Sequence, residues 1–207
     1  NLSVAAIRYY LANDYDRSRA LAEEALRLGE STGNPWAKSY SRWAIALIHM
    51  EHGRPDKMIE VMEEVISLGD QADIIPIQVF SRAELAWGYS DLGAFEQGLE
   101  LVRLALTSVE ELLPAWRLFP TVVMALLHLR RGDLTAAEAA LEEAGNIPGP
   151  EPNSALLAGI LSALIEGELA LVKQDYDQVI TGMDQLVAQL QQMGIELFIC
   201  EGLLLKG

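Results

Sequence analysis

GDLT (residues 132–135) decides the fold of this chain, because four similar segments recur at nearly equal distances along it. These are NDYD (13–16), GRPD (53–56), GAFE (93–96) and QDYD (174–177). The first residues of successive segments are 40, 40, 39 and 42 positions apart. So regular a recurrence of turn-forming residues predicts an internal repeat, in which each segment is a tight turn between two antiparallel helices.

The residues on both sides of the turns follow one register. A small residue stands seven positions before each turn, a ring usually stands four positions before it, and a mostly small residue stands twelve positions after its first residue. The three sets are Ala6, Ala46, Ala86, Ala125 and Gly167; Tyr9, His49, Tyr89, His128 and Ala170; and Ala25, Val65, Ala105, Ala144 and Leu186. Small side chains at fixed positions let two helices approach closely, and a ring fills the wedge between their axes.

The last residues of the five turn segments are all polar. We expect them to be N-cap or first-turn residues of the second helices, where they meet unpaired N–H groups. They are Asp16, Asp56, Glu96, Thr135 and Asp177.

The tripeptide Arg131-Gly132-Asp133 also matches a cell-adhesion signal, which would require a protruding loop in an extracellular protein. Because it falls where the other units carry their turns, we interpret it as a repeat turn.

Composition limits the class of protein. Hydrophobic residues make up 51% of the 207 residues, and strand-like alternation is rare, so an all-α chain is predicted. The formal net charge of -15 argues against a nucleic-acid partner. A single cysteine, Cys200, excludes an internal disulfide, and the most apolar run (155–165) is too short to span a membrane. We therefore expect a cytoplasmic protein that does not bind membranes.

The repeat pattern resembles the tetratricopeptide repeat family, which has a small residue midway along the first helix, then an aromatic residue and a turn of the Gly-Asp-Tyr-Asp type. The resemblance implies a right-handed α-α superhelix of about five helix-turn-helix repeats with a partial terminal helix. The period near 40 is similar to that of the MalT-like repeat region of LuxR-class regulators and signalling ATPases. This second resemblance implies a sensor or interaction arm of a bacterial signalling or transcriptional regulator. The apolar, uncapped helices expected at both ends suggest a fragment of a larger multidomain protein.

The chain is expected to form one solenoid over residues 1–207. Its units are 1–34, 35–75, 76–114, 115–153 and 154–195, with a partial unit at 196–207. The expected helices are 2–12, 17–30, 36–51, 56–69, 76–91, 96–112, 115–131, 135–144, 154–173, 177–193 and 196–206. The segment GNIPGPEPNS (145–154) contains Pro148, Pro150 and Pro152, which favour an extended crossing and a change of superhelical pitch.

In tetratricopeptide arrays the first helices of successive units line the concave face, so the register predicts the residues of a groove. The predicted groove residues are Tyr10, Tyr40, Trp43, Leu47, Met50, Phe80, Trp87 and Phe119, joined by Arg42 and Arg82. An apolar and aromatic surface of this kind is typical of a peptide-binding site. Two alternatives stay open. In the first, the rings pack against each other or against a neighbouring segment of the same chain. In the second, the arginines pair with local carboxylates such as Glu51, Glu84 or Asp91 instead of binding an anionic ligand.

We find no motif for catalysis, for a metal or for a cofactor. His49 and His128 occupy the ring position of the repeat and are interpreted as packing residues. The sequence thus predicts a non-enzymatic scaffold that binds a protein or peptide segment, a domain of the parent protein or a small regulatory ligand. The alternative is a passive spacer or oligomerisation module in a larger signalling ATPase, with end-to-end contacts between copies.

Overall fold

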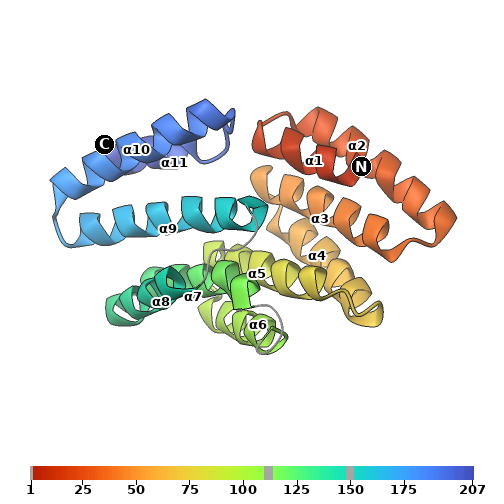
Figure 1. The fold of residues 1–207 in the computed structure, drawn as a ribbon, viewed down its shortest axis with the longest axis horizontal. Helices are drawn as coiled ribbons and strands as arrows, with labels where there is room; N and C mark the ends of the chain where they lie inside the picture. The colour runs from red at the N-terminus through yellow and green to blue at the C-terminus, as the bar shows by residue number, and fades with distance from the viewer. Residues whose placement is uncertain (1, 110–113, 148–151) are drawn as a thin grey trace.

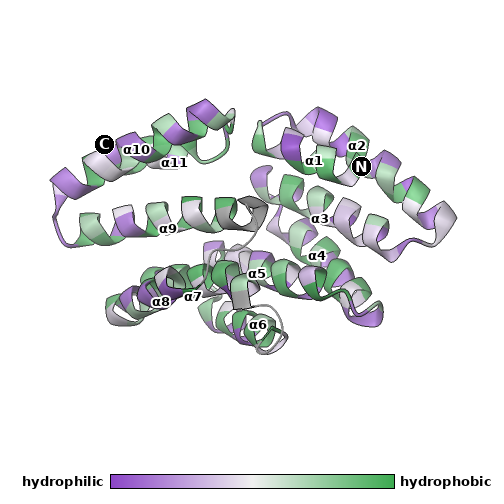
Figure 2. Cartoon of the chain, viewed as in Figure 1, coloured by the Kyte–Doolittle hydropathy of each residue, from purple (hydrophilic) through white to green (hydrophobic). Residues whose placement is uncertain are grey.

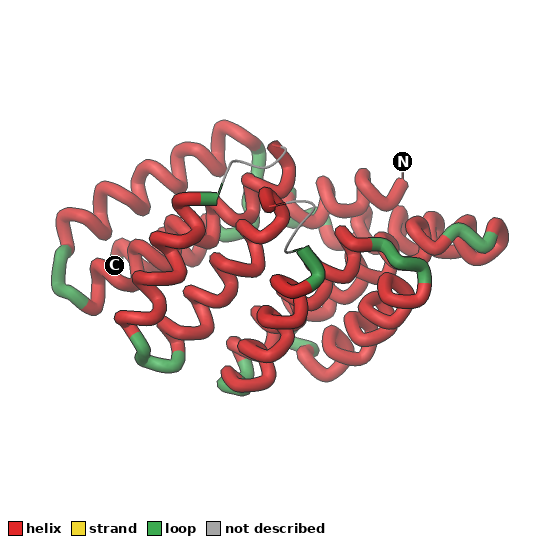
Figure 3. The backbone as a smooth tube through the Cα atoms, turned by 60° about the horizontal axis from the view of Figure 1, so that its bottom comes forward, coloured by secondary structure: helices red, strands yellow, loops and turns green. Residues whose placement is uncertain are grey.

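A computed structural model describes residues 2–109, 114–147 and 152–207 of the chain, and these residues form an all-α helical-repeat solenoid (Figure 1). Across these ranges there is no β-strand, and short loops join the helices (Figure 3). The elements are α1 (Leu2–Leu11), α2 (Tyr15–Thr32), α3 (Pro35–Glu51), α4 (Pro55–Gln71), α5 (Ile75–Asp91), α6 (Phe95–Thr107), a 3-10 helix (Pro114–Arg117), α7 (Leu118–Arg130), α8 (Leu134–Asn146), α9 (Pro152–Val172), α10 (Tyr176–Met193) and α11 (Ile199–Lys206).

The five predicted turns share one backbone conformation. The first residue of each turn has a positive φ: 60° at Asn13, 64° at Gly53, 72° at Gly93, 86° at Gly132 and 62° at Gln174. Glycine adopts this left-handed conformation without a steric penalty, and asparagine tolerates it better than most residues do. The tripeptide 131–133 therefore lies in the turn between α7 and α8, as its register predicts.

The N-cap of each second helix is the second residue of the turn. The carboxylates of Asp14, Asp133 and Asp175 accept the backbone N–H three residues on, whereas Arg54 and Ala94 provide no side-chain cap. The four predicted acidic residues at 16, 56, 96 and 177 lie in the first turn, and Thr135 directly follows the first helical residue. The first-turn interpretation is confirmed, and the N-cap interpretation of these five residues is wrong.

The small residues of the repeat register are buried between helices. Ala6, Ala46, Ala86 and Ala125 are fully inaccessible, and Gly167 is buried as well. Gly98 on α6 marks a further close approach, because a Cβ there would lie 2.6 Å from Cδ2 of Leu127 and 3.0 Å from the carbonyl oxygen of Ala86. These contacts confirm that small side chains set the distance between neighbouring helices.

The helices form two layers. Each odd-numbered helix packs on the next odd-numbered helix, so α1, α3, α5, α7, α9 and α11 make a continuous inner layer. The even-numbered helices α2, α4, α6, α8 and α10 lie against them on the outside (Figure 1). Hydrophilic residues gather on outer helices such as α2, α8 and α10, while α9 is mostly hydrophobic (Figure 2). The layers follow from an apolar face that each helix pair buries against its neighbours.

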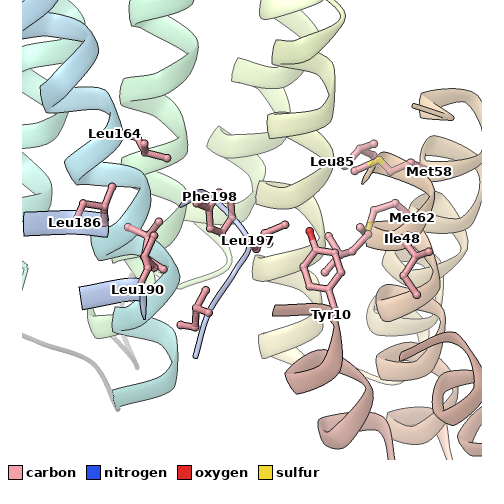
Figure 4. Close-up of a cluster of buried hydrophobic side chains, with 14 of the residues drawn as sticks. Tyr10, Ile48, Met58, Met62, Leu85, Leu164, Leu186, Leu190, Leu197 and Phe198 are labelled. Atoms are coloured by element: carbon pink, nitrogen blue, oxygen red, sulfur yellow. The ribbon is translucent and has the colours of Figure 1, made fainter. Parts of the chain in front are cut away.

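The last unit closes on the first. The backbone N–H groups of Glu196 and Leu197 donate to the carbonyl oxygen of Leu11, at 3.1 and 3.3 Å, at the end of α1. Leu197 and Phe198 are buried, and they lie between Tyr10 on α1 and Leu164 on α9 (Figure 4). The helix expected over 196–206 therefore begins only at Ile199, because Phe198 has a positive φ of 72° and residues 195–198 serve the closure.

Most of the other expected helix bounds differ from the observed ones by one or two residues, and larger differences occur at the end of α6 and the start of α7. Helix α6 ends at Thr107 instead of residue 112, and the next unit opens with the 3-10 turn at Pro114–Arg117. Among the described residues, α8 and α9 are the consecutive helices that pack least, and α9 instead packs on α7 and α10. Helix α9 begins at Pro152, which fits proline's preference for the first helical turn. The expected extended crossing at Pro148 and Pro150 lies outside the described residues.

Candidate functional site

A central cavity of about 600 Å³ lies between the inner helices, near their C-terminal ends. Each of the six inner helices contributes to its lining, as do Pro55 and Met58 of α4. Four of the predicted groove residues line it: Tyr10 on α1, Leu47 and Met50 on α3, and Trp87 on α5. The repeat register thus brings residues from different units together at one site.

Helix α5 presents its most polar face to this cavity. Glu84, Trp87, Gly88 and Asp91 are spaced by three or four residues, so they follow one helical stripe, and all four line the cavity. The opposite faces of α5 bury alanine, leucine and valine against neighbouring helices. The stripe is therefore an acidic and aromatic surface that α5 turns toward the cavity.

Glu84 is the most unusual group of the site. Its residue is 5% exposed, and among the described residues no hydrogen bond or ion pair reaches its carboxyl group. Burial, with the nearby charge of Glu51 as a second cause, raises the pKa of Glu84 from 4.5 to about 8. A carboxyl group buried without a donor is costly when charged, so Glu84 holds a proton at neutral pH.

Glu51, the last residue of α3, forms a hydrogen bond across the cavity wall. The hydroxyl of Tyr10 donates to Oε1 of Glu51 at 2.8 Å. Burial raises the pKa of Tyr10 well above 10, and the carboxylates of Glu51 and Glu84 raise it further. Burial also raises the pKa of the Glu51 carboxyl, although the hydrogen bond from Tyr10 acts in the opposite direction. The two acids and the phenol therefore share one poorly solvated region.

Arg130 is the only basic residue that lines the cavity among the described residues. Its guanidinium forms an ion pair with Asp91 and donates to Oγ of Ser90 at 3.2 Å. Glu168 on α9 lines the same wall, and burial raises its pKa while the charge of Arg130 lowers it. Glu201 on α11 adds a fifth carboxyl group. The cavity therefore has an excess of acidic groups, of which one is neutralised by an arginine.

The closing segment forms part of the cavity wall. Phe198 stacks on Trp87, with ring centroids 5.9 Å apart and planes inclined by 17°. Leu204 and Leu205 of α11 line the cavity beside it. The end of the chain described here thus covers a stretch of concave surface that the sequence assigned to an external ligand.

The other predicted rings lie on the N-terminal halves of the inner helices, away from the cavity lining. Trp43 contacts Tyr40 edge-on at 5.1 Å and stacks on Phe80 at 6.5 Å, and Phe80 contacts Phe119 at 5.9 Å. Phe119 is 2% exposed, and the indole N–H of Trp43 is buried without an acceptor among the described residues. We call Trp36, Tyr40, Trp43, Phe80, Trp116 and Phe119 the aromatic row. Its rings pack against each other, as one alternative from the sequence supposed.

The two predicted arginines point toward outer helices. Arg42 forms ion pairs with Glu30 and Glu64, at 3.2 and 3.0 Å. Arg82 binds both carboxylate oxygens of Asp70 at 2.9 and 2.7 Å. Local pairing is therefore what the structure shows, and the expected partners Glu51, Glu84 and Asp91 are wrong. No free arginine of this register faces the cavity within the described residues.

Sequence reasoning did not assign several residues to the site, among them Glu84 and Phe198. A signal for Glu84 was present, because it lies one turn before Trp87 on the stripe that carries the predicted groove residues. Phe198 had no such signal, since it was assigned to a regular helix of a partial repeat. Its place depends on how far five units curve together, which no local pattern encodes.

Among the described residues, no group of three or more histidine, cysteine, aspartate or glutamate side chains is arranged to hold a metal ion. No helix within the same ranges combines the length and the apolar character needed to cross a lipid bilayer. Comparison with models of known protein families and with curated protein sequences found no match.

Proposed function

We propose that this chain is a non-enzymatic binding module and that its ligand, a peptide segment or a small regulatory molecule, occupies the central cavity. One observation carries the proposal: six inner helices bring an unpaired buried carboxyl group, Glu84, beside an aromatic side chain, Trp87, in a cavity of about 600 Å³. Concave sites of this size with a few convergent polar groups are typical of ligand-binding pockets. The resemblance to MalT-like repeats favours a role as the cytoplasmic sensor arm of a bacterial signalling or transcriptional regulator.

The cavity provides a way to transmit occupancy. A ligand there touches several repeat units at once, together with Phe198 and Leu204 of the closing segment. It therefore favours the arrangement of units whose spacing fits it, at the expense of others. An attached domain would respond to that shift of population.

The experiment compares two tryptophans of the inner helices. The chain is screened against a small-molecule set and a displayed peptide library, and each ligand is titrated by calorimetry into Trp87→Ala and Trp43→Ala variants of unchanged helicity. Loss of binding in Trp87→Ala alone, by roughly 2 kcal/mol or more, supports the cavity. Loss in Trp43→Ala alone places the ligand on the aromatic row and contradicts the proposal.

The second candidate function is a structural spacer. It is supported by the closure itself, because the hydrogen bonds from Glu196 and Leu197 to Leu11 join the first and last units directly. A spacer needs this rigidity and no ligand. It predicts that neither tryptophan variant changes any binding, while variants that open the closure change the spacing of attached domains.

A further inference from the structure

We propose that the central cavity binds an organic cation, an alkyl chain that carries an ammonium or guanidinium group, with the cationic group at Glu84. This inference rests on the proposed function, because it names the chemical class of the cavity's ligand. The shared chemistry is found in a free aliphatic amine and in a lysine or arginine side chain of a protein segment. The test below distinguishes the two sources.

The first argument is the missing partner of Glu84. Its residue is 95% buried, it lines the cavity, and no described residue donates a hydrogen bond to it. No described residue uses its lone pairs, so the carboxyl group at the cavity surface is free to accept hydrogen bonds from a ligand. A cationic donor matches it best, because charge-assisted hydrogen bonds are the stronger ones.

The second argument is the charge balance of the wall. Among the described residues, each titratable or charged group that lines the cavity with Glu84 is acidic, apart from the hydroxyl of Tyr10 and the guanidinium of Arg130. The acidic groups are Glu51, Asp91, Glu168 and Glu201. Glu51 and Asp91 are also the last residues of α3 and α5, where the negative ends of the helix dipoles lie. The field inside the cavity therefore favours a cation and opposes an anion.

The third argument is the apolar part of the lining. Trp87 and Phe198 provide aromatic faces, and Leu47, Met50 and Leu164 provide aliphatic surface. Aromatic faces attract cations, and aliphatic side chains pack well against a methylene chain. An alkyl ammonium or alkyl guanidinium ion has both a cationic group and a methylene chain. A hydrated metal ion would make no favourable contact with the apolar surface.

The test uses agmatine, spermidine and a short peptide with one arginine, each titrated by isothermal calorimetry at 150 mM salt. Pentanol is the neutral probe, and glutarate is the anionic probe. Glu84→Gln removes the buried carboxyl group with little change of shape. Glu23→Gln is the matched control, since it removes one exposed carboxyl group from the outer helix α2. We expect Glu84→Gln to weaken cation binding by roughly tenfold or more and Glu23→Gln to leave it unchanged.

Proton release gives a second readout. Because the pKa of Glu84 is about 8 without a cation beside it, binding of a cation at pH 7 expels a proton, and the binding enthalpy depends on the ionisation enthalpy of the buffer. The affinity of the native chain should rise roughly tenfold or more between pH 6.5 and 8.5. Glu84→Gln should lose both effects.

The outcomes separate the two proposals. Binding of the peptide alone supports the inference and identifies a protein segment as the source of the cation. Equal weakening by Glu84→Gln and Glu23→Gln, or no cation binding by the native chain, overturns it. If the screen instead yields a neutral or anionic ligand that depends on Trp87, the proposed function stands and the cationic class is wrong.

Discussion

The indole of Trp87 on α5 and the phenyl ring of Phe198 stack at 5.9 Å, although they belong to the third unit and to the segment before the last helix. This contact holds the segment before α11 against the third unit, and the two hydrogen bonds to Leu11 hold it against the first. The closing segment therefore covers part of the concave face, and the cavity beneath it stays partly open. Access to it depends on how firmly the closing segment stays in place.

Phe198→Ala should loosen the closing segment. Phe198 is 7% exposed, and removal of a buried phenyl ring typically costs about 3 kcal/mol or more. Because each unit of a solenoid contacts only its neighbours, the effect should concentrate at the closure. Hydrogen exchange should show protection of the Glu196 and Leu197 amides reduced by roughly 100-fold, since about 3 kcal/mol corresponds to that factor.

Leu204→Ala is the matched control for the closing segment. Leu204 lies on α11 and is 80% exposed, so its truncation should leave the exchange of both amides almost unchanged. Equal protection in Phe198→Ala and the native chain would contradict the role of the stacked rings.

Glu84→Gln should change how stability depends on pH. Folded Glu84 has a pKa of about 8, whereas an unfolded glutamate titrates near 4.3. Between these values the folded chain binds more protons than the unfolded one, so the free energy of unfolding falls as pH rises. The variant lacks this contribution. Urea unfolding should give similar stabilities at pH 5 and a variant more stable by on the order of 3 kcal/mol at pH 8.5.

The outer carboxyl group of Glu23 again provides the control. Glu23→Gln changes the net charge equally but removes a solvated group, so its stability should run parallel to that of the native chain from pH 5 to 8.5. A Glu84→Gln curve that also runs parallel to the native curve would show that Glu84 ionises normally in the fold.

The N-caps offer a prediction about the repeat itself. Ala94 has φ of -88° and ψ of 57°, close to -90° and 76° at Asp133, whose carboxylate caps α8. Ala94→Asp should therefore stabilise the chain by about 0.5–2 kcal/mol, and Asp133→Ala should destabilise it by a similar amount. Urea unfolding of both variants checks this, and a loss of stability in Ala94→Asp would show that the turns are not equivalent.

The aromatic row should respond unevenly to truncation. Trp43 lies between Tyr40 and Phe80, so Trp43→Ala should lower the free energy of unfolding by about 2–4 kcal/mol. Trp36 is 47% exposed at the end of the row, and Trp36→Ala should cost less than about 1 kcal/mol. Similar costs in urea unfolding would mean that the row is not a packed structural unit.

Local sequence signals predicted most of the fold. The turns at Asn13, Gly53, Gly93, Gly132 and Gln174 each need a left-handed residue, and the alanines seven positions earlier need close helix packing. Both requirements act within one unit or between neighbouring units, so the residues that meet them recur at a fixed spacing in the sequence. The same register predicted that Tyr10, Leu47, Met50 and Trp87 share one surface, and all four line the central cavity.

The rest of the site depends on the sum of several packing angles. The contact of Glu196 with Leu11 exists because five units curve by the right amount, and no single unit specifies that total. The left-handed Phe198 follows from the same closure, as a bulky aromatic residue rarely adopts this conformation without a tertiary cause. The partners of Arg42 and Arg82 were missed because both side chains point from the inner layer toward outer helices.

The way in which the first and last units meet has a mechanical consequence. In an open array of repeats, the outermost units fray first because each lacks one neighbour. Here the first and last units meet through the segment before α11, at the hydrogen bonds of Glu196 and Leu197 to Leu11. The fourth and fifth pairs of helices stay packed through α7 and α9, although α8 and α9 pack little, and the ion pair of Lys173 with Glu138 also bridges them. Under load or mild heating the closure should therefore open before the joint between the fourth and fifth pairs.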